Sequence, residues 1–179
     1  GKQQAERIAS RLKPEKVQAI YSSLLRRALH TAQAIARYHQ AEVQIEPSLN
    51  EMDVGELEGI LIEKLSSYLS ELATRRDVDK VVSKQYDGEM LTEVQQRAWS
   101  TIQRLVDKHG DGAIVVVSHY FVILSIICSV LSLPLSEIGR LKLDVGSIST
   151  IMFDERGTRL TLFNDKCHLS PRNSDNNEG

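Results

Sequence analysis

Apolar residues recur with the period of an α-helix in several long stretches of the chain. In residues 3–12 the apolar side chains fall on one face, and Pro14 ends the pattern. Residues 91–109 repeat it over a longer distance, with Thr92 as a candidate cap and Gly110 after the last turn. Helices are therefore predicted over residues 3–12, 25–39, 61–76, 91–109 and 120–132.

Short runs rich in β-branched residues alternate with these helices. The strands predicted from them are 17–21, 42–45 and 113–117, followed by a hairpin of 146–153 and 160–163 around the turn Asp154-Glu155-Arg156-Gly157. This order predicts one α/β domain over residues 1–169, a three-layer α/β/α sandwich with a mainly parallel sheet. We expect the first three strands and 146–153 to share that sheet. Residues 77–90 read as a polar excursion, and 170–179 as a disordered tail.

One apolar run is long enough to suggest a membrane span, because residues 113–136 contain no Lys, Arg, Asp or Glu. The run opens with β-branched residues, breaks at Ser118-His119-Tyr120 and ends near Pro134. That break favours a buried strand followed by a buried helix. We therefore expect no contact with a membrane.

Composition narrows the class of protein further. A chain of 179 residues that is 41% hydrophobic and 26% charged is typical of a single globular domain. The formal net charge of −2 argues against a dedicated nucleic-acid binder. Cys128 and Cys167 provide no disulfide framework and indicate a reducing, cytoplasmic compartment. No secretory signal opens the chain, whose first residue is Gly, and no oligomeric state is predicted.

Polar groups lie where α/β proteins place their sites, just past the carboxyl ends of strands. Arg26 and Arg27 fall in the first turn of the helix over 25–39, where backbone N–H groups and a guanidinium can bind phosphate. The alternative is a pair of solvated surface charges, although arginines at this helix end oppose the helix dipole. His119 lies between a very apolar strand and a very apolar helix, where a polar side chain needs a partner or a function.

Residues 49–59 form an acidic loop that contains glycine. Three interpretations are open for this segment: a solvated loop, a metal site, or the source of a general acid. Its carboxylates are Glu51, Asp53, Glu56 and Glu58. Their spacing is not that of a calcium loop, which disfavours a metal site.

Taken in chain order, these segments resemble motifs of the histidine phosphatase (phosphoglycerate mutase-like) superfamily, from about residue 5 to residue 169. The matching segments are Tyr21-Ser22-Ser23 with Arg27-Ala28 and Thr31-Ala32, Leu49-x-Glu51 with Gly55 and Glu58-Gly59, Gly88-Glu89, Val117-Ser118-His119, and Phe163-Asn164-Asp165 with His168-Leu169. Leu24 stands where the family commonly has Pro. Tyr120 stands where Gly often follows the second histidine, so its side chain either narrows the phosphate pocket or points into the core.

The family also begins with a strand that ends in Arg-His-Gly, whose histidine becomes phosphorylated, and the chain contains no such triplet. The remaining histidines are predicted on helices or at the far end of the domain; they are His30, His39, His109 and His168. We therefore expect the first strand to be missing, by truncation of an ordinary family member rather than in a natural pseudoenzyme.

The resemblance implies a phosphomonoester hydrolase that forms a phosphohistidine in the full-length parent, with this chain itself inactive. Arg27 and a protonated His119 would bind the phosphate, while Glu51 would protonate the leaving oxygen and then activate water. The substrate would be a small phosphorylated metabolite, the activity phosphatase rather than mutase, with neither a metal nor an organic cofactor. The alternative is a non-catalytic regulatory domain that keeps the anion pocket.

Overall fold

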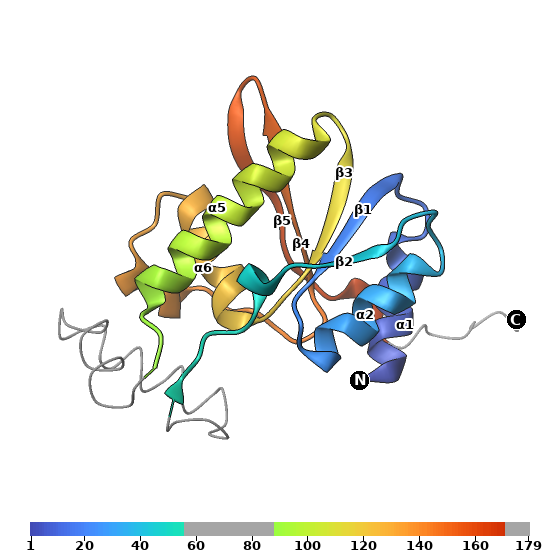
Figure 1. Cartoon of the computed structure of the whole chain (residues 1–179), viewed down its shortest axis with the longest axis horizontal. Coiled ribbons are helices and arrows are strands. Elements are labelled where there is room, and N and C mark those ends of the chain that lie inside the picture. Colours follow the sequence, from blue (N-terminus) through green and yellow to red (C-terminus); the bar gives the residue numbers. More distant parts are fainter. Residues whose placement is uncertain (56–87, 171–179) are drawn as a thin grey trace, which may run out of the picture.

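The structure is a computed structural model that describes residues 1–55 and 88–170 (Figure 1). The helix predicted over 61–76, most of the polar excursion and the tail from residue 171 lie outside these residues. In chain order the elements, with η marking 3-10 helices, are α1 (Lys2–Leu12), β1 (Val17–Ser22), α2 (Arg26–Ala36), β2 (Val43–Ile45), η1 (Pro47–Leu49), α5 (Leu91–His109), β3 (Ala113–Val117), α6 (Tyr120–Val130), η3 (Leu135–Arg140), β4 (Ile148–Asp154), β5 (Gly157–Asp165) and η4 (Cys167–Leu169).

Strand β1 lies in the middle of a parallel sheet with the order β2-β1-β3. Ile20 of β1 is in register with Val43 of β2 on one side and with Val115 of β3 on the other. The chain passes through α2 between β1 and β2, and through α5 before β3, as parallel neighbours require. The parallel sheet predicted from the alternation of strands and helices is confirmed for these three strands.

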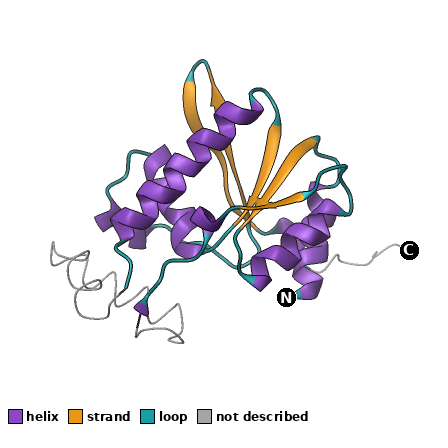
Figure 2. Ribbon diagram, in the orientation of Figure 1, coloured by secondary structure: helices purple, strands orange, loops and turns teal. Residues whose placement is uncertain are grey.

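Side chains of β1 alternate between two apolar clusters, one on each face of the sheet. Ile20 belongs to the cluster that contains Ile8 of α1 and Ile35 of α2. Ala19 and Tyr21 belong to the other cluster, which is built mainly from α5 and α6. Helices therefore cover both faces, as Figure 2 shows, and the predicted three-layer arrangement is confirmed.

The strand predicted over 146–153 does not join the parallel sheet, so that expectation is wrong. It forms β4, which pairs with β5 in a separate antiparallel sheet. Ile148 of β4 belongs to the same apolar cluster as Val115 and Val117, so β4 lies near β3 without a ladder between them in the described part of the chain. The alternation of apolar and polar residues predicts a strand but does not specify its neighbour, which explains the error.

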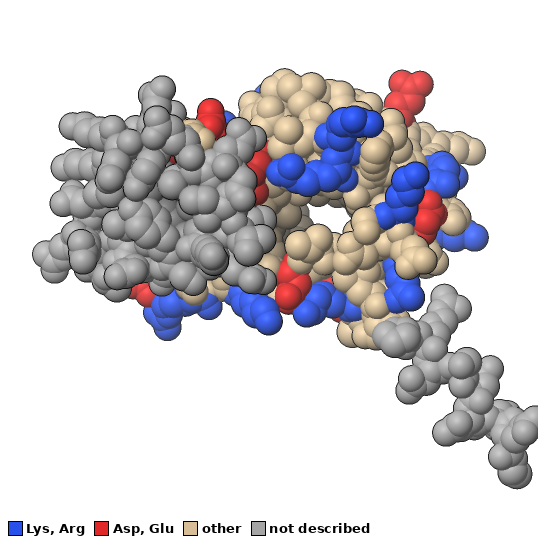
Figure 3. Space-filling view, turned by 90° about the horizontal axis from the view of Figure 1, so that it is seen from below, with Lys and Arg blue, Asp and Glu red and all other residues tan. Residues whose placement is uncertain are grey.

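The two edges of β3 consequently differ. The carbonyl oxygen of Val117 accepts from the backbone N–H of Ser23, on the β1 side. Because the N–H and C=O of one strand residue point the same way, Val115 also faces β1, whereas Ile114 and Val116 face the opposite edge. Seen from below, an opening passes through the middle of the described residues, with Lys and Arg side chains on both sides of it (Figure 3).

The long apolar run is divided between β3 and α6, as predicted. No helix among the described residues is long and apolar enough to cross a membrane. Helix α5 has the predicted bounds, but its cap differs from the prediction. The backbone N–H of Met90 donates to Glu93 Oε2 at 2.9 Å, so Glu93 closes the first turn and Thr92 does not.

Candidate functional site

His119 is the N-cap residue of α6, placed there by the end of β3, and only 6% of its surface is exposed. Arg27 Nε donates to His119 Nδ1 at 3.1 Å, and Ser23 Oγ lies 2.6 Å from His119 Nε2. An arginine Nε–H can only donate, so Nδ1 has a free lone pair and the proton of the neutral ring is on Nε2. His119 therefore donates to Ser23 Oγ, which also accepts from the backbone N–H of Leu25 at 3.2 Å.

Burial, together with the positive charges of Arg27 and Arg97, lowers the pKa of His119 to about 4. The protein's own groups thus hold this imidazole neutral near pH 7. The protonated form expected from the sequence needs the added negative charge of a bound anion. Arg27 is then the permanent positive charge of the cluster.

Arg27 lies exposed in the first turn of α2. Its Nε reaches His119, and the described residues give its two terminal nitrogens no partner. The N-cap of α2 is Leu25, which provides no side-chain acceptor for the first N–H groups of the helix. A forked guanidinium beside free backbone donors can bind a tetrahedral oxyanion.

Glu51 follows the short helix η1 and reaches the start of α6. Its Oε1 accepts from the backbone N–H groups of Met52 at 2.9 Å and Phe121 at 3.3 Å. Burial raises the pKa of Glu51, although these N–H groups and the charge of Arg27 act in the opposite direction. A carboxyl group that keeps its proton to higher pH than usual can act as a general acid.

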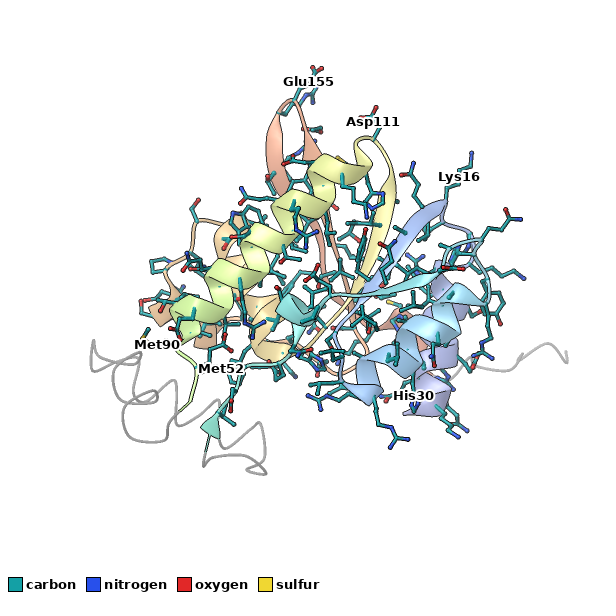
Figure 4. All side chains as sticks on the ribbon, in the orientation of Figure 1. Lys16, His30, Met52, Met90, Asp111 and Glu155 are labelled. Carbon is teal, nitrogen blue, oxygen red and sulfur yellow. The ribbon has the colours of Figure 1, made fainter. Side chains whose placement is uncertain are left out.

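The three predicted side chains converge, as expected, although they come from separate elements. Arg27 contacts His119 directly, and Glu51 binds the first turn of the helix that His119 caps. Figure 4 shows the location: Lys16 and Asp111, before β1 and β3, mark one end of the sheet, and Met52 lies toward the other. The cluster is thus at the carboxyl ends of β1 and β3, where ligand sites of α/β sheets lie.

Two nearby residues have roles that the sequence did not predict. Ser23 reads as a helix-start residue, but Leu25 is the N-cap of α2, and Ser23 is fully buried against His119. Asn50 ties the acidic loop to the Arg27 segment, because its Oδ1 accepts from the backbone N–H of Leu24 at 2.9 Å. Small polar residues are common in loops and at helix ends, so their presence in the sequence predicts neither the Ser23–His119 contact nor the Asn50–Leu24 contact.

Tyr120 packs against the apolar cluster of α5 and α6, and its ring meets that of Phe121 edge-on. Of the two orientations expected from the sequence, the structure therefore has the one toward the core. Arg26 is exposed and makes no contact with the cluster. Glu56 and Glu58 lie outside the described residues.

Among the described residues, none of the other four histidines forms a hydrogen bond with Arg27, Glu51 or His119. His30 lies in α2 and His39 in the turn after it, His109 ends α5 next to Tyr21, and His168 lies in η4, where its Nε2 is 2.9 Å from the Gly146 carbonyl oxygen.

Comparison with known proteins gives a consistent result. The model of the histidine phosphatase superfamily (branch 1) matches residues 1–166. Phosphoserine phosphatase 1 of Hydrogenobacter thermophilus is 32% identical over 170 residues, covering 94% of this chain and 80% of that protein. Phosphoglycerate mutase-like protein 4 of Arabidopsis thaliana is 38% identical over 133 residues, covering 70% of this chain and 56% of that protein. The crystal structure of a phosphoserine phosphatase of Entamoeba histolytica in complex with 3-phosphoglyceric acid superposes with a TM-score of 0.81 at 28% identity. The superposition covers 95% of this chain and 84% of that one.

Proposed function

The chain belongs to the histidine phosphatase superfamily, and from that membership we propose that it provides the phosphate-binding and acid–base groups of a phosphomonoester hydrolase acting through a phosphohistidine. The observation that supports this most directly is the convergence of Arg27, His119 and Glu51 at one end of the sheet. The proposed substrate is a small phosphorylated metabolite, in keeping with the 3-phosphoglyceric acid bound by the Entamoeba relative. We expect the reaction to need neither a metal nor an organic cofactor and to take place in the cytoplasm.

Each of the three residues has a role in this reaction. The terminal nitrogens of Arg27 bind equatorial phosphate oxygens, and His119 adds a donor once the anion has raised its proton affinity. As an imidazole nitrogen of the nucleophile bonds to phosphorus and the ester P–O bond breaks, Glu51 gives its proton to the leaving oxygen. Water then attacks phosphorus, the N–P bond breaks, and Glu51 takes the proton from that water as phosphate leaves.

His119 is poorly placed to be the nucleophile itself. Its Nδ1 accepts from Arg27 and its Nε2 contacts Ser23, so neither nitrogen is free to attack. The remaining histidines form no hydrogen bond with the cluster among the described residues. We propose that the nucleophile is the histidine of an Arg-His-Gly strand that precedes Gly1 in the full-length protein. In this proposal the strand pairs with the edge of β3 formed by Ile114 and Val116, which has no partner strand among the described residues.

A second candidate, a regulatory domain that binds phosphate without turnover, is favoured by one specific observation. Of the five histidines of the chain, only His119 lies in the cluster. Such a domain would use Arg27 and His119 in the same way and would leave Glu51 without a catalytic role.

Single-turnover release of phosphate from p-nitrophenyl phosphate distinguishes these possibilities. We expect none from the 179-residue chain and clear release from a longer protein that carries the proposed Arg-His-Gly strand before Gly1, with a phosphohistidine visible by ³¹P NMR. Release by the 179-residue chain that disappears in His119→Ala would mean that His119 is the nucleophile. Phosphate binding without release by the longer protein would establish the regulatory domain instead.

A further inference from the structure

Arg97, in the second turn of α5, is a charged residue for which the proposed reaction has no use. Its Nε and Nη2 donate to the two carboxylate oxygens of Glu89 at 2.6 and 2.8 Å. Both side chains are mostly buried, at 23% and 20% exposed. A forked pair with this geometry fixes the orientation of the guanidinium as well as its position.

The nitrogens of Arg97 also reach the loop that carries Glu51. Nη1 donates to the carbonyl oxygen of Ser48 at 2.6 Å, and Nη2 lies 3.5 Å from the carbonyl oxygen of Glu51 itself. The guanidinium is close enough to the cluster that its charge adds to the lowering of the pKa of His119. Arg97 therefore joins α5 to the backbone on either side of the proposed acid.

Glu89 fastens the same loop further along. Its backbone N–H donates to the carbonyl oxygen of Asp53 at 2.7 Å, and its Oε2 accepts from the N–H of Asp53 at 3.4 Å. Gly88 permits this approach, because a Cβ there would lie 2.9 Å from the Asp53 carbonyl oxygen. The loop from Ser48 to Asp53 is thus held at both ends by a single ion pair.

We propose that Arg97 and Glu89 are positioning residues that hold the Glu51 carboxyl group against the first turn of α6. This assignment rests on the proposed function, since it gives the pair a role toward the proposed acid. The donors that the described residues offer the buried carboxyl are backbone N–H groups, those of Met52 and Phe121 and, more weakly, that of Tyr120. Without the pair, the loop would keep the contacts of Asn50 with Leu24 and of Ser118 with the Leu49 carbonyl oxygen, but it would lose its ties to α5, and the carboxyl group could turn toward water more easily.

The test is the pKa of Glu51, followed through its side-chain carboxyl carbon by ¹³C NMR in the 179-residue chain. In Arg97→Gln we expect it to fall toward that of an exposed glutamate, because burial is what raises it. The sign is decisive, since loss of a nearby positive charge alone would raise it. An unchanged or higher value in a folded Arg97→Gln protein would overturn the proposal.

Arg104→Gln is the matched control. Arg104 lies on the same helix and forms an ion pair with Glu46, just before η1, but within the described residues it donates no hydrogen bond to Ser48 or Glu51. We expect that variant to leave the pKa of Glu51 unchanged; an equal fall there would count against a specific role for Arg97. If Arg97→Gln does not fold, Glu89→Gln and Arg97→Lys take its place, with a fall expected in both and a smaller one in the lysine variant, which keeps the charge but loses the fork.

Titration with inorganic phosphate separates this inference from the proposed function. Phosphate affinity should be the same in Arg97→Gln and in the unaltered chain, because Arg27 and His119 bind the anion. Failure of the unaltered chain to bind phosphate would refute the proposed function, while the pKa of Glu51 would still decide whether Arg97 positions it. A large loss of phosphate affinity in Arg97→Gln with no change in that pKa would make Arg97 an anion ligand and overturn its positioning role.

Discussion

The two edges of β3 have different neighbours and different consequences for the site. On one edge, Val115 and Val117 pair with β1, whose continuation brings Ser23 and Arg27 to His119. On the other edge, the N–H and C=O groups of Ile114 and Val116 have no partner strand among the described residues, and β4 pairs with β5 instead. Unpaired edges of very apolar strands are unusual in the middle of a domain.

The difference separates two kinds of catalytic group. The paired edge brings together Ser23, Arg27 and His119, the groups proposed to bind phosphate. The other edge has no partner strand among the described residues, and it is where the proposed nucleophile strand would pair. The proposal thus places phosphate binding and phosphoryl transfer at opposite edges of the same strand.

Hydrogen exchange tests this comparison with the largest expected effect. In the 179-residue chain the amides of Ile114 and Val116 should exchange about a thousandfold faster than those of Val115 and Val117, because only the second pair is hydrogen-bonded within the sheet. In a longer protein that carries the proposed Arg-His-Gly strand before Gly1, all four should be protected. The amide exchange rates of these four residues are measured by NMR. Equal protection of the four amides in the shorter chain would refute the assignment of a free edge.

Much of this fold could be predicted because its elements are specified locally. Helix α5 has its predicted bounds since an amphipathic repeat ends at Gly110, whose φ of +54° suits glycine. The convergence of Arg27 and His119 followed from a general rule, that the carboxyl ends of neighbouring parallel strands meet at one end of a sheet.

What could not be predicted depends on contacts between distant segments. The hairpin β4–β5 was assigned to the wrong sheet because alternation does not identify a neighbour. Nothing in the sequence singled out Arg97, because its contact with the Ser48 carbonyl oxygen joins segments 49 residues apart. Ser23 is a residue type that often caps helices, but here it is buried against His119 in the candidate site.

Arg27→Ala tests the paired edge with a smaller effect. Loss of a charge-assisted pair of hydrogen bonds should weaken inorganic phosphate binding by roughly 10- to 100-fold, corresponding to about 1.5–3 kcal/mol. Arg26→Ala is the matched control, since Arg26 is exposed on the same turn and does not contact His119. Calorimetry at low salt measures both, and an equal loss in the two variants would mean that phosphate responds to the general charge of the helix start.

The smallest effect concerns pH and the burial of His119 at the end of the paired edge. As pH falls through the ordinary histidine value of 6.5, the imidazole of the unfolded chain takes up a proton, while the folded one stays neutral until about pH 4. The unfolded state then binds more protons, so the free energy of unfolding should fall across this window, by at most about 1.4 kcal/mol per pH unit. Glu51 acts in the opposite sense, because its raised pKa makes the folded state the better proton binder above the ordinary glutamate value. The informative quantity is therefore the difference between variants in the slope of the unfolding free energy against pH. His119→Gln should remove the loss of stability at acid pH. His30→Gln, on the exposed surface of α2, is the matched control. Urea denaturation between pH 4.5 and 7 measures both slopes, and identical slopes in the two variants would show that His119 is protonated as easily in the folded chain as in the unfolded one.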